Sequence, residues 1–157
     1  MAKVELQITI QAPVERVFDL ARNIDLHVVS AAKTQEKVIG GKNTGLLELN
    51  DTVTWRARHL GIWQTLTSKM TEFDKPNFFT DQMLKGAFKS MKHEHYFKAE
   101  GQGTVMTDVL VFESPFGLVG EVVDRLFLTN YMANFIKERN AVVKRTAESG
   151  AWREFLE

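Results

Sequence analysis

The residues best suited to chemistry are histidines in segments with the pattern of a β-strand. His93 and His95 alternate with charged residues and a tyrosine, and the same alternation places Met91 and Phe97 on either side of them. Because successive side chains of a strand point to opposite faces, these four side chains share one face. The apolar residues at its ends indicate that this face points inward, so we expect two neighbouring imidazoles in the interior.

A second segment is expected to direct a third imidazole to the same interior. Val53, Trp55, Ala57 and His59 alternate with threonine and arginine residues. This spacing again gives one apolar and one polar face, as in a strand that is buried on one side. Three of the four histidines are therefore expected to approach one another inside the protein.

Buried imidazoles need hydrogen-bond partners, because an unpaired buried polar group costs about 1–3 kcal/mol. Asp81 alternates with Phe79 and Met83, Asp108 lies in a later strand-like segment, and Tyr131 lies in the last helical segment. We expect the two carboxylates and the phenol to be the partners. Two interpretations stay open: a polar patch that orients the hydroxyl, carbonyl or carboxylate group of a ligand, or a network that only stabilises the fold.

The same residue types suggest two further kinds of chemistry. His93 or His95 beside Asp81 or Asp108 could transfer a proton during cyclisation or dehydration of a polyketide-like substrate, which needs no cofactor. His59 and the other two histidines could form a metal site of the zinc type. Paired strand histidines are far commoner than metal sites, so we expect no metal and no other cofactor. His93, His95 and Asp108 are the catalytic candidates.

These side chains must be positioned by an antiparallel meander. Alternation predicts a first strand over residues 4–10, and apolar residues at three- and four-residue spacing predict a short helix after Pro13. Asn23 and Asp25 can cap a second short helix over residues 26–32. Turn signals then separate six more strands, which we expect at residues 36–39, 51–59, 62–73, 78–83, 88–99 and 104–113.

The longest element is expected last. After Pro115 the sequence is helical for about thirty residues, until Ser149 and Gly150 end the helix. Its apolar stripe moves to the opposite face near Thr129 and Asn130. The helix is either broken there, or it is continuous and its two halves cover different parts of the protein, with the earlier half closing a pocket.

Composition excludes several classes of protein. A chain of 157 residues with 44% hydrophobic and 25% charged residues is typical of one globular domain. Basic and acidic residues both number 20 and form no basic run, so nucleic-acid binding is not expected. The lack of cysteine excludes disulfides, thiolate nucleophiles and cysteine metal sites. Without a signal-peptide pattern or an apolar run of ~20 residues, we expect a cytoplasmic protein with no integral membrane association.

Four motifs, taken in order, resemble the START/polyketide-cyclase (SRPBCC) superfamily, whose fold is shared with the major birch pollen allergen. They are Ala12-Pro13-Val14-Glu15-Arg16-Val17-Phe18, Asp51-Thr52-Val53-Thr54-Trp55-Arg56-Ala57-Arg58-His59, Met91-Lys92-His93-Glu94-His95-Tyr96-Phe97, and the run from Gly103-Thr104 to Phe112-Glu113-Ser114-Pro115-Phe116-Gly117. The resemblance covers residues 4–148 and is closest to bacterial cyclase/dehydrase-like members of unassigned ligand. It implies an α+β helix-grip fold, in which a seven-stranded curved antiparallel sheet surrounds a long C-terminal helix and encloses a cavity.

The resemblance implies that residues 1–157 form a single START-like domain that binds a small hydrophobic molecule, such as a lipid, polyketide or quinone. Members of the superfamily share no universal catalytic residues, so the fold alone does not establish an activity. Our first hypothesis is therefore a non-catalytic carrier or sensor. The expected cavity walls are Trp55, Phe79, Met83, Met91, Phe97, Leu126 and Phe127, and the expected polar groups are His59, Asp81, His93, His95 and Tyr131.

Two other functions stay open. One is an enzyme of the aromatase/cyclase or dehydratase type, for which His93→Ala would abolish turnover and preserve ligand affinity. The other is the binding of a protein partner through the loops at the cavity mouth and through Trp152, Phe155 and Leu156, which follow the expected end of the long helix. Such an apolar tail more often docks on its own domain. The sequence also leaves a homodimer open.

Overall fold

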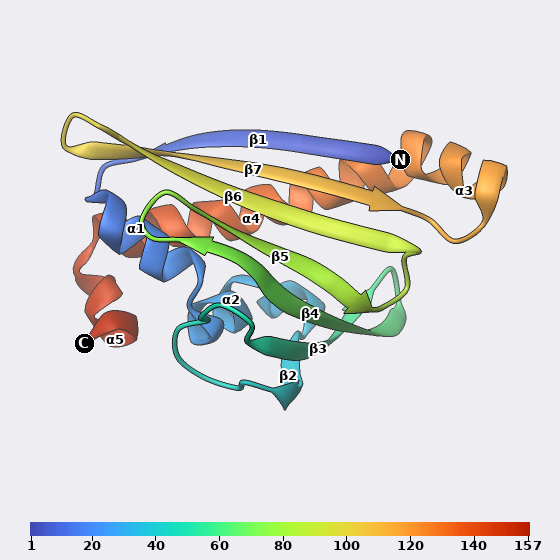
Figure 1. Ribbon diagram of the computed structural model, residues 1–157, viewed down its shortest axis with the longest axis horizontal. Coiled ribbons are helices and arrows are strands. Elements are labelled where there is room, and N and C mark those ends of the chain that lie inside the picture. Colours follow the sequence, from blue (N-terminus) through green and yellow to red (C-terminus); the bar gives the residue numbers. More distant parts are fainter.

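An antiparallel sheet of seven strands forms most of the structure. In the computed structural model, which describes all residues from 1 to 157, the strands are β1 (Ala2–Ile10), β2 (Lys37–Gly41), β3 (Thr52–His59), β4 (Ile62–Asp74), β5 (Phe78–Lys85), β6 (Ser90–Glu100) and β7 (Gly103–Glu113). Their order across the sheet is β1-β7-β6-β5-β4-β3-β2 (Figure 1). The predicted seven-stranded sheet is confirmed, with strand ends shifted by one or two residues.

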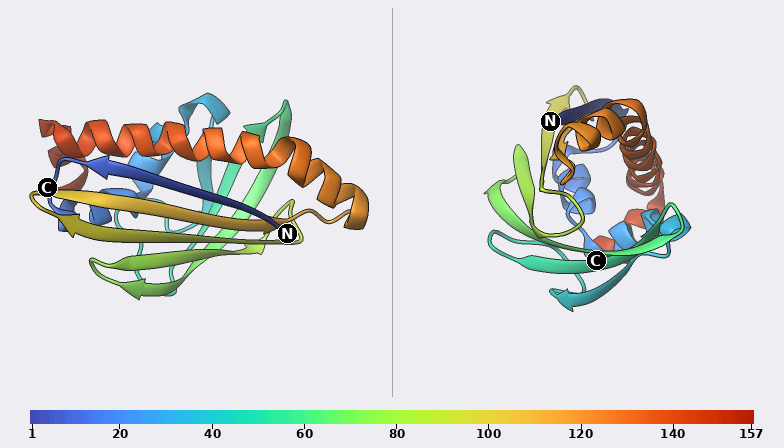
Figure 2. Two further views of the ribbon diagram at one scale, coloured as in Figure 1. Left: turned by 90° about the horizontal axis from the view of Figure 1, so that it is seen from above. Right: turned by 90° about the vertical axis from the view of Figure 1, so that its right-hand side faces the viewer.

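Irregular strand pairing lets the sheet bend around the helix. The pairing register shifts between Val38 and Gly40 of β2, and at two places between β4 and β5. An extra residue at such a bulge bends the strand and increases its local twist. The end view in Figure 2 shows that the strands curl around and that the long C-terminal helix closes the open side. This is the predicted helix-grip arrangement.

Two short helices follow β1 and close one end of the sheet. They are α1 (Val14–Ala21) and α2 (Ile24–Ser30), and a single 3₁₀ turn, η1 (Ala32–Thr34), leads from α2 toward β2. The Asn23 side chain caps α2, because its oxygen accepts a hydrogen bond from the Leu26 amide at 2.9 Å. The two predicted helices are therefore present, with α2 beginning two residues earlier than expected.

The main apolar core lies beneath α1. Phe18 is fully buried and contacts the rings of Phe73, Phe79 and Phe97 edge-on, at centroid distances of 5.1 to 5.5 Å. Such aromatic pairs contribute about 0.5–1.5 kcal/mol each beyond the burial of their surface. This end of the space between sheet and helix is therefore filled by the protein's own side chains.

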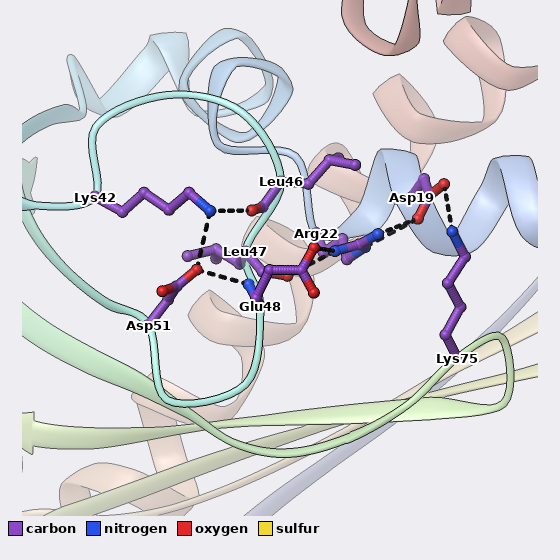
Figure 3. A network of polar contacts seen from close by, with 8 residues as sticks. All are labelled: Asp19, Arg22, Lys42, Leu46, Leu47, Glu48, Asp51 and Lys75. Atoms are coloured by element: carbon purple, nitrogen blue, oxygen red, sulfur yellow. Dashed lines mark hydrogen bonds and ion pairs between the residues drawn. The ribbon is translucent and has the colours of Figure 1, made fainter.

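A buried arginine fastens the long segment between β2 and β3. Arg22 is 4% exposed and donates hydrogen bonds to the carboxylates of Asp19 in α1 and Glu48 in the segment, at 2.7 to 2.9 Å. Lys42 and Asp51 form an ion pair of 3.0 Å between the two ends of the same segment (Figure 3). These contacts hold the entry to β3 in place, and β3 carries two of the predicted site residues.

The long C-terminal helix is continuous but changes its winding once. α3 (Gly117–Val123) passes through a π-helical turn, η2 (Asp124–Leu128), into α4 (Thr129–Glu148). A π turn takes up an extra residue and so rotates the following face of the helix. This explains why the apolar stripe changes sides near Thr129. None of the helices is long and apolar enough to cross a membrane.

The two parts of this helix lie differently against the sheet. α4 runs along the concave face, whereas α3 extends beyond the sheet at the end of the molecule where the N-terminus lies (Figure 1 and Figure 2). The buried carboxylate of Asp124 fixes the junction, because it accepts hydrogen bonds from the amide and the hydroxyl of Ser114 at the end of β7. The outward side of α3 is left uncovered.

The last residues pack against the domain's own core. A short 3₁₀ turn, η3 (Gly150–Trp152), and α5 (Arg153–Leu156) fold back toward α1. Trp152, Phe155 and Leu156 are half-buried against the main core, and the Arg16 guanidinium lies 4.2 Å from the centre of the Trp152 ring. The tail is therefore already packed within its own chain, which removes one of the two contacts that the partner-binding hypothesis named.

Candidate functional site

A cavity of about 280 Å³ lies between the concave face of the sheet and the C-terminal helix. Its apolar walls come from both layers: Trp55, Ala57, Leu66, Met91 and Leu110 from the strands, and Leu128, Met132, Phe135 and Ile136 from the helix. Exposed residues such as Leu60, Phe116 and Val123 line one end and mark its opening. The other end is lined by polar side chains, most of which are paired with one another.

His95 is 5% exposed and lies at the centre of a polar cluster that it forms with Asp81, His93 and Asp108 at the inner end of the cavity. Its Nε2 is 2.9 Å from Asp81 and its Nδ1 is 3.1 Å from Asp108. Ionised carboxylates only accept hydrogen bonds, so both ring nitrogens carry a proton and the ring is an imidazolium. Burial disfavours this charge, but the hydrogen bonds to Asp108 and Asp81 outweigh it and raise the pKa of His95 to about 9.

His93 is held in the opposite, neutral form. Its Nε2 donates to the Asp108 carboxylate at 2.8 Å, and Asn140 of α4 donates to the other oxygen of Asp108 at 2.7 Å. Burial and the positive charge of His95 lower the pKa of His93, despite the neighbouring carboxylates. Nδ1 of His93 therefore carries a lone pair, has no hydrogen-bond partner in the protein, and belongs to a residue that lines the cavity.

A second group of polar residues lines the same inner end. Arg139 of α4 donates through Nη2 to Nδ1 of His27 at 2.7 Å, and Nε2 of His27 donates to the buried carboxylate of Glu36 at 2.7 Å. Burial and the charge of Arg139 lower the pKa of His27, so this ring is neutral, and it stacks on Trp55 at 4.2 Å. Nε of Arg139 is buried without a partner, and its Nη1 makes no hydrogen bond to the protein.

His59 lies nearer the opening, apart from the other histidines. Its Nδ1 forms a hydrogen bond of 2.7 Å with the Tyr131 hydroxyl, and its ring packs edge-on against Phe135. Burial lowers the pKa of His59 and raises the pKa of Tyr131, so both groups are neutral near pH 7. This pair links β3 to α4 across the cavity.

The polar cluster is a poor metal site at neutral pH. Ligand atoms of Asp81, His93 and His95 lie within 4.8 Å of one another, which is close enough for a shared ion. A metal ligand must be unprotonated, however, and the raised pKa of His95 keeps both of its nitrogens protonated and bonded to carboxylates. His59 is not part of this group, so the three-histidine site considered from the sequence does not form.

The family of polyketide cyclases, dehydrases and lipid transport proteins matches residues 1–148. The chain belongs to this family. No curated protein sequence matches the chain. The matched region takes in the whole sheet, the cavity and α4, so the polar cluster lies within the family's own fold.

Solved structures share the fold of this family member at low sequence identity. TTHA0849 from Thermus thermophilus is 19% identical, with a TM-score of 0.75 over 92% of this chain and 96% of its own. A START superfamily protein from Mycobacterium smegmatis is 10% identical, with a TM-score of 0.72 over 94% and 98%. Major latex-like protein 151 from Panax ginseng is 15% identical, with a TM-score of 0.69 over 94% and 97%. These likenesses show the fold alone, and with the family match they confirm the predicted superfamily.

The cavity brings together half of the residues that the sequence singled out as ligand-binding. Trp55, His59, Asp81, Met91, His93 and Tyr131 line it. Phe79, Met83, His95, Phe97, Leu126 and Phe127 do not. His95 stacks on His93, Phe79 and Phe97 pack around Phe18 in the core, and Leu126 and Phe127 are exposed in the π turn.

The sequence did not predict that His27, Glu36 and Arg139 line the cavity. Arg139 had a usable signal, because it continues the helical stripe of Phe135 and Ile136 at three- and four-residue spacing, where a cation is unusual. His27 and Glu36 had none, since they come from a short helix and a loop that reach the cavity only through the tertiary fold.

Proposed function

We propose that this family member binds a small, largely apolar molecule that carries a keto or hydroxyl group at one end. The observation that supports this most directly is the inner end of the cavity. There, nitrogens of Arg139 are donors without a protein partner, and Nδ1 of His93 is an acceptor without one. Buried polar groups are normally satisfied, so an unpaired donor and acceptor beside an apolar cavity favour a ligand that supplies the missing groups.

The volume of the cavity limits the size of the ligand. An apolar cavity of about 150 Å³ holds one benzene molecule. At about 280 Å³ this cavity has room for a molecule of roughly two fused rings, or for an aliphatic chain of similar volume. Long-chain lipids would have to extend through the opening.

The local charges favour a neutral polar group over a carboxylate. Burial opposes the ionised form of Glu36, Asp81 and Asp108, but their partners lower each pKa, so all three carboxylates are charged. Only His95 and Arg139 offset them with positive charge. A ligand anion would add a fourth negative charge to this low-dielectric site, whereas a carbonyl or hydroxyl oxygen can accept from Arg139 without that cost.

Three two-ring probes test this proposal through quenching of Trp55 fluorescence. The account expects 2-acetylnaphthalene to bind more tightly than 2-methylnaphthalene and 2-naphthoate. Arg139→Met should weaken the binding of 2-acetylnaphthalene by about tenfold or more, which is the usual effect of losing a hydrogen bond to a charged group. The affinity for 2-methylnaphthalene should stay almost unchanged. Arg145→Met, an exposed position on the same helix, is the matched control and should behave as wild type. Equal affinity for the three probes in the wild type would refute the proposal.

A catalytic role is the second candidate, and the pairing of His93 with Asp108 favours it. The carboxylate orients the ring through Nε2 and leaves Nδ1 without a protein partner on a residue that lines the cavity, which suits a general base. With a ketone oxygen held by Arg139, Nδ1 could remove a proton from the carbon next to the carbonyl group and form an enolate. Return of that proton regenerates the ketone.

Deuterium exchange distinguishes the two candidates with the same probe. For an enzyme, the methyl protons of 2-acetylnaphthalene exchange with D₂O in the presence of the protein, and proton NMR records their loss. His93→Gln then stops the exchange but still binds the probe. A carrier binds the ketone without accelerating exchange over the buffer, and that result would exclude the catalytic candidate for this substrate class.

A further inference from the structure

The end of the molecule around the cavity opening carries an unusual amount of exposed apolar surface. The most exposed side chains there are Leu118 (82%), Phe116 (74%), Leu126 (73%), Val119 (70%), Ile62 (64%) and Leu84 (58%). They come from three segments that are distant in the sequence: residues 60–63 at the turn from β3 into β4, residues 84–88 at the end of β5 and in the loop after it, and residues 116–127, which begin just before α3 and continue into η2. We call these three segments the apolar collar. They lie together at the end of the molecule beyond which α3 extends (Figure 1).

The collar and the cavity opening are parts of one surface. Leu60, Phe88 and Phe116 belong to the three collar segments, and each also lines the cavity. A molecule that leaves the cavity therefore reaches apolar side chains before it reaches water. This continuity distinguishes the collar from exposed apolar residues elsewhere, such as Val29 and Ile39, which do not line the cavity.

The helical part of the collar has the character of an interfacial helix. At 100° per residue, Leu118, Val119, Val122, Leu126 and Phe127 spread over about half of the circumference, and all of them are exposed. The opposite side holds the helix to the protein through Asp124 and its bonds to Ser114. A helix with one broad apolar face and a fixed back can lie in the boundary between lipid headgroups and acyl chains.

The charges of the collar favour an anionic partner. Arg58 and Lys85 are exposed and form no ion pair, whereas Lys89 and Arg125 are paired with Glu113 and Glu121. Glu121 is paired and Asp124 is buried and hydrogen-bonded, so Lys85 within the collar and Arg58 at its edge carry free positive charges, and the collar has no free negative charge. The whole chain has a net charge of zero, so this excess is local.

From these observations we infer that the collar is a docking surface for an anionic lipid bilayer, through which the cavity exchanges its ligand with the membrane. The apolar side chains enter the headgroup boundary, and Arg58 and Lys85 contact the negatively charged headgroups. The docking does not depend on the identity of the ligand, so it can be tested separately from the proposed function.

Sedimentation with vesicles tests the inference on the full chain. The wild type should sediment with vesicles of phosphatidylcholine and phosphatidylserine, less with phosphatidylcholine alone, and less again at high salt. The double variant Leu118→Ser/Leu126→Ser should lower the bound fraction by about tenfold or more. Val29→Ser/Ile39→Ser, at positions 55% and 56% exposed and outside the collar, is the matched control and should bind as wild type does.

Two further measurements make the test decisive. Brominated phosphatidylcholine should quench the emission of Trp63 in the collar, and Trp63→Phe should remove that quenching. Lack of vesicle binding by the wild type, or unchanged binding by the Leu118/Leu126 variant, overturns the inference. Sedimentation velocity gives the remaining outcome: a dimer that the same double variant dissociates would assign the collar to a second copy of this chain and likewise overturn it.

Discussion

At the scale of single residues, one carboxylate organises the inner end of the cavity. Asp108 is 2% exposed and accepts hydrogen bonds from His93, His95 and Asn140. Its hydrogen bonds favour the charged form of both rings, but His95 is also bound by Asp81 and is the one that is charged. Burial and the charge of His95 then keep His93 neutral. Two histidines two residues apart on the same strand face thereby acquire different protonation states, and only the neutral one keeps a ring nitrogen without a protein partner.

The charged form of His95 predicts how stability depends on pH. The pKa of His95 is about 9 in the folded protein and 6.5 for a free ring. Its contribution to the free energy of unfolding is therefore complete below pH 6.5 and is lost as the pH rises through 9. The pKa values of His27, His59 and His93 are lowered, so these residues reduce the stability of the folded protein as the pH falls below 6.5. They do not alter stability above that pH. Between pH 7 and 9 the unfolding equilibrium constant should therefore increase by up to about tenfold per pH unit.

Urea denaturation at pH 7, 8 and 9 measures this dependence. His95→Gln is the control, because a glutamine cannot titrate, and its stability should be lower but nearly constant over the same range. A wild-type protein equally stable at pH 7 and pH 9 would show that His95 is not held as an imidazolium.

Strand parity explains which of these residues the sequence could predict. His93 and His95 have a period of two on a strand, and the carboxylates of Asp81 and Asp108 lie on neighbouring strands, so their common face follows from alternation alone. Arg139 and His27 meet only because α2 and α4 cross near the same wall of the cavity. No local pattern encodes such a crossing.

At the scale of elements, the π turn in the C-terminal helix joins the part that covers the sheet to the part that extends beyond it. Met132 and Ile136 of α4 line the cavity, whereas Leu126 and Phe127 within the turn are exposed. The sequence showed that the apolar stripe changes face near Thr129, but a break and a rotation give the same pattern. The extra residue of a π turn is a backbone feature without a sequence signature of its own.

The C-terminal tail yields a prediction at this scale. Removal of residues 151–157 deletes the half-buried side chains of Trp152, Phe155 and Leu156 from the main core. From the apolar surface of three half-buried side chains, we expect the free energy of unfolding to fall by about 2–4 kcal/mol. Urea denaturation of the truncated chain measures the loss. Unchanged stability would mean that the tail does not pack as described.

At the scale of the whole molecule, the sequence predicted the fold more completely than the cavity. The order of strands, helices and turns specifies a helix-grip fold because few arrangements bury one face of a curved sheet under one helix. The size of the cavity depends instead on where large side chains point within that frame. Phe79 and Phe97 were expected as cavity walls, yet they fill the space under α1, and the empty volume lies farther along the sheet beside Trp55 and Phe135.

The central claim is that this cavity holds a small molecule, and a single substitution can close it. Ala57 is buried on β3 and lines the cavity, so Ala57→Phe places an aromatic ring in the space of the ligand, whereas Ala99→Phe adds the same ring at an exposed position of β6. The most direct measurement is native mass spectrometry of the wild type and both variants, purified from cells of the source organism. The account predicts a non-covalent adduct on the wild type and on Ala99→Phe, and none on Ala57→Phe. An adduct-free wild type, or the same adduct on all three proteins, would contradict it.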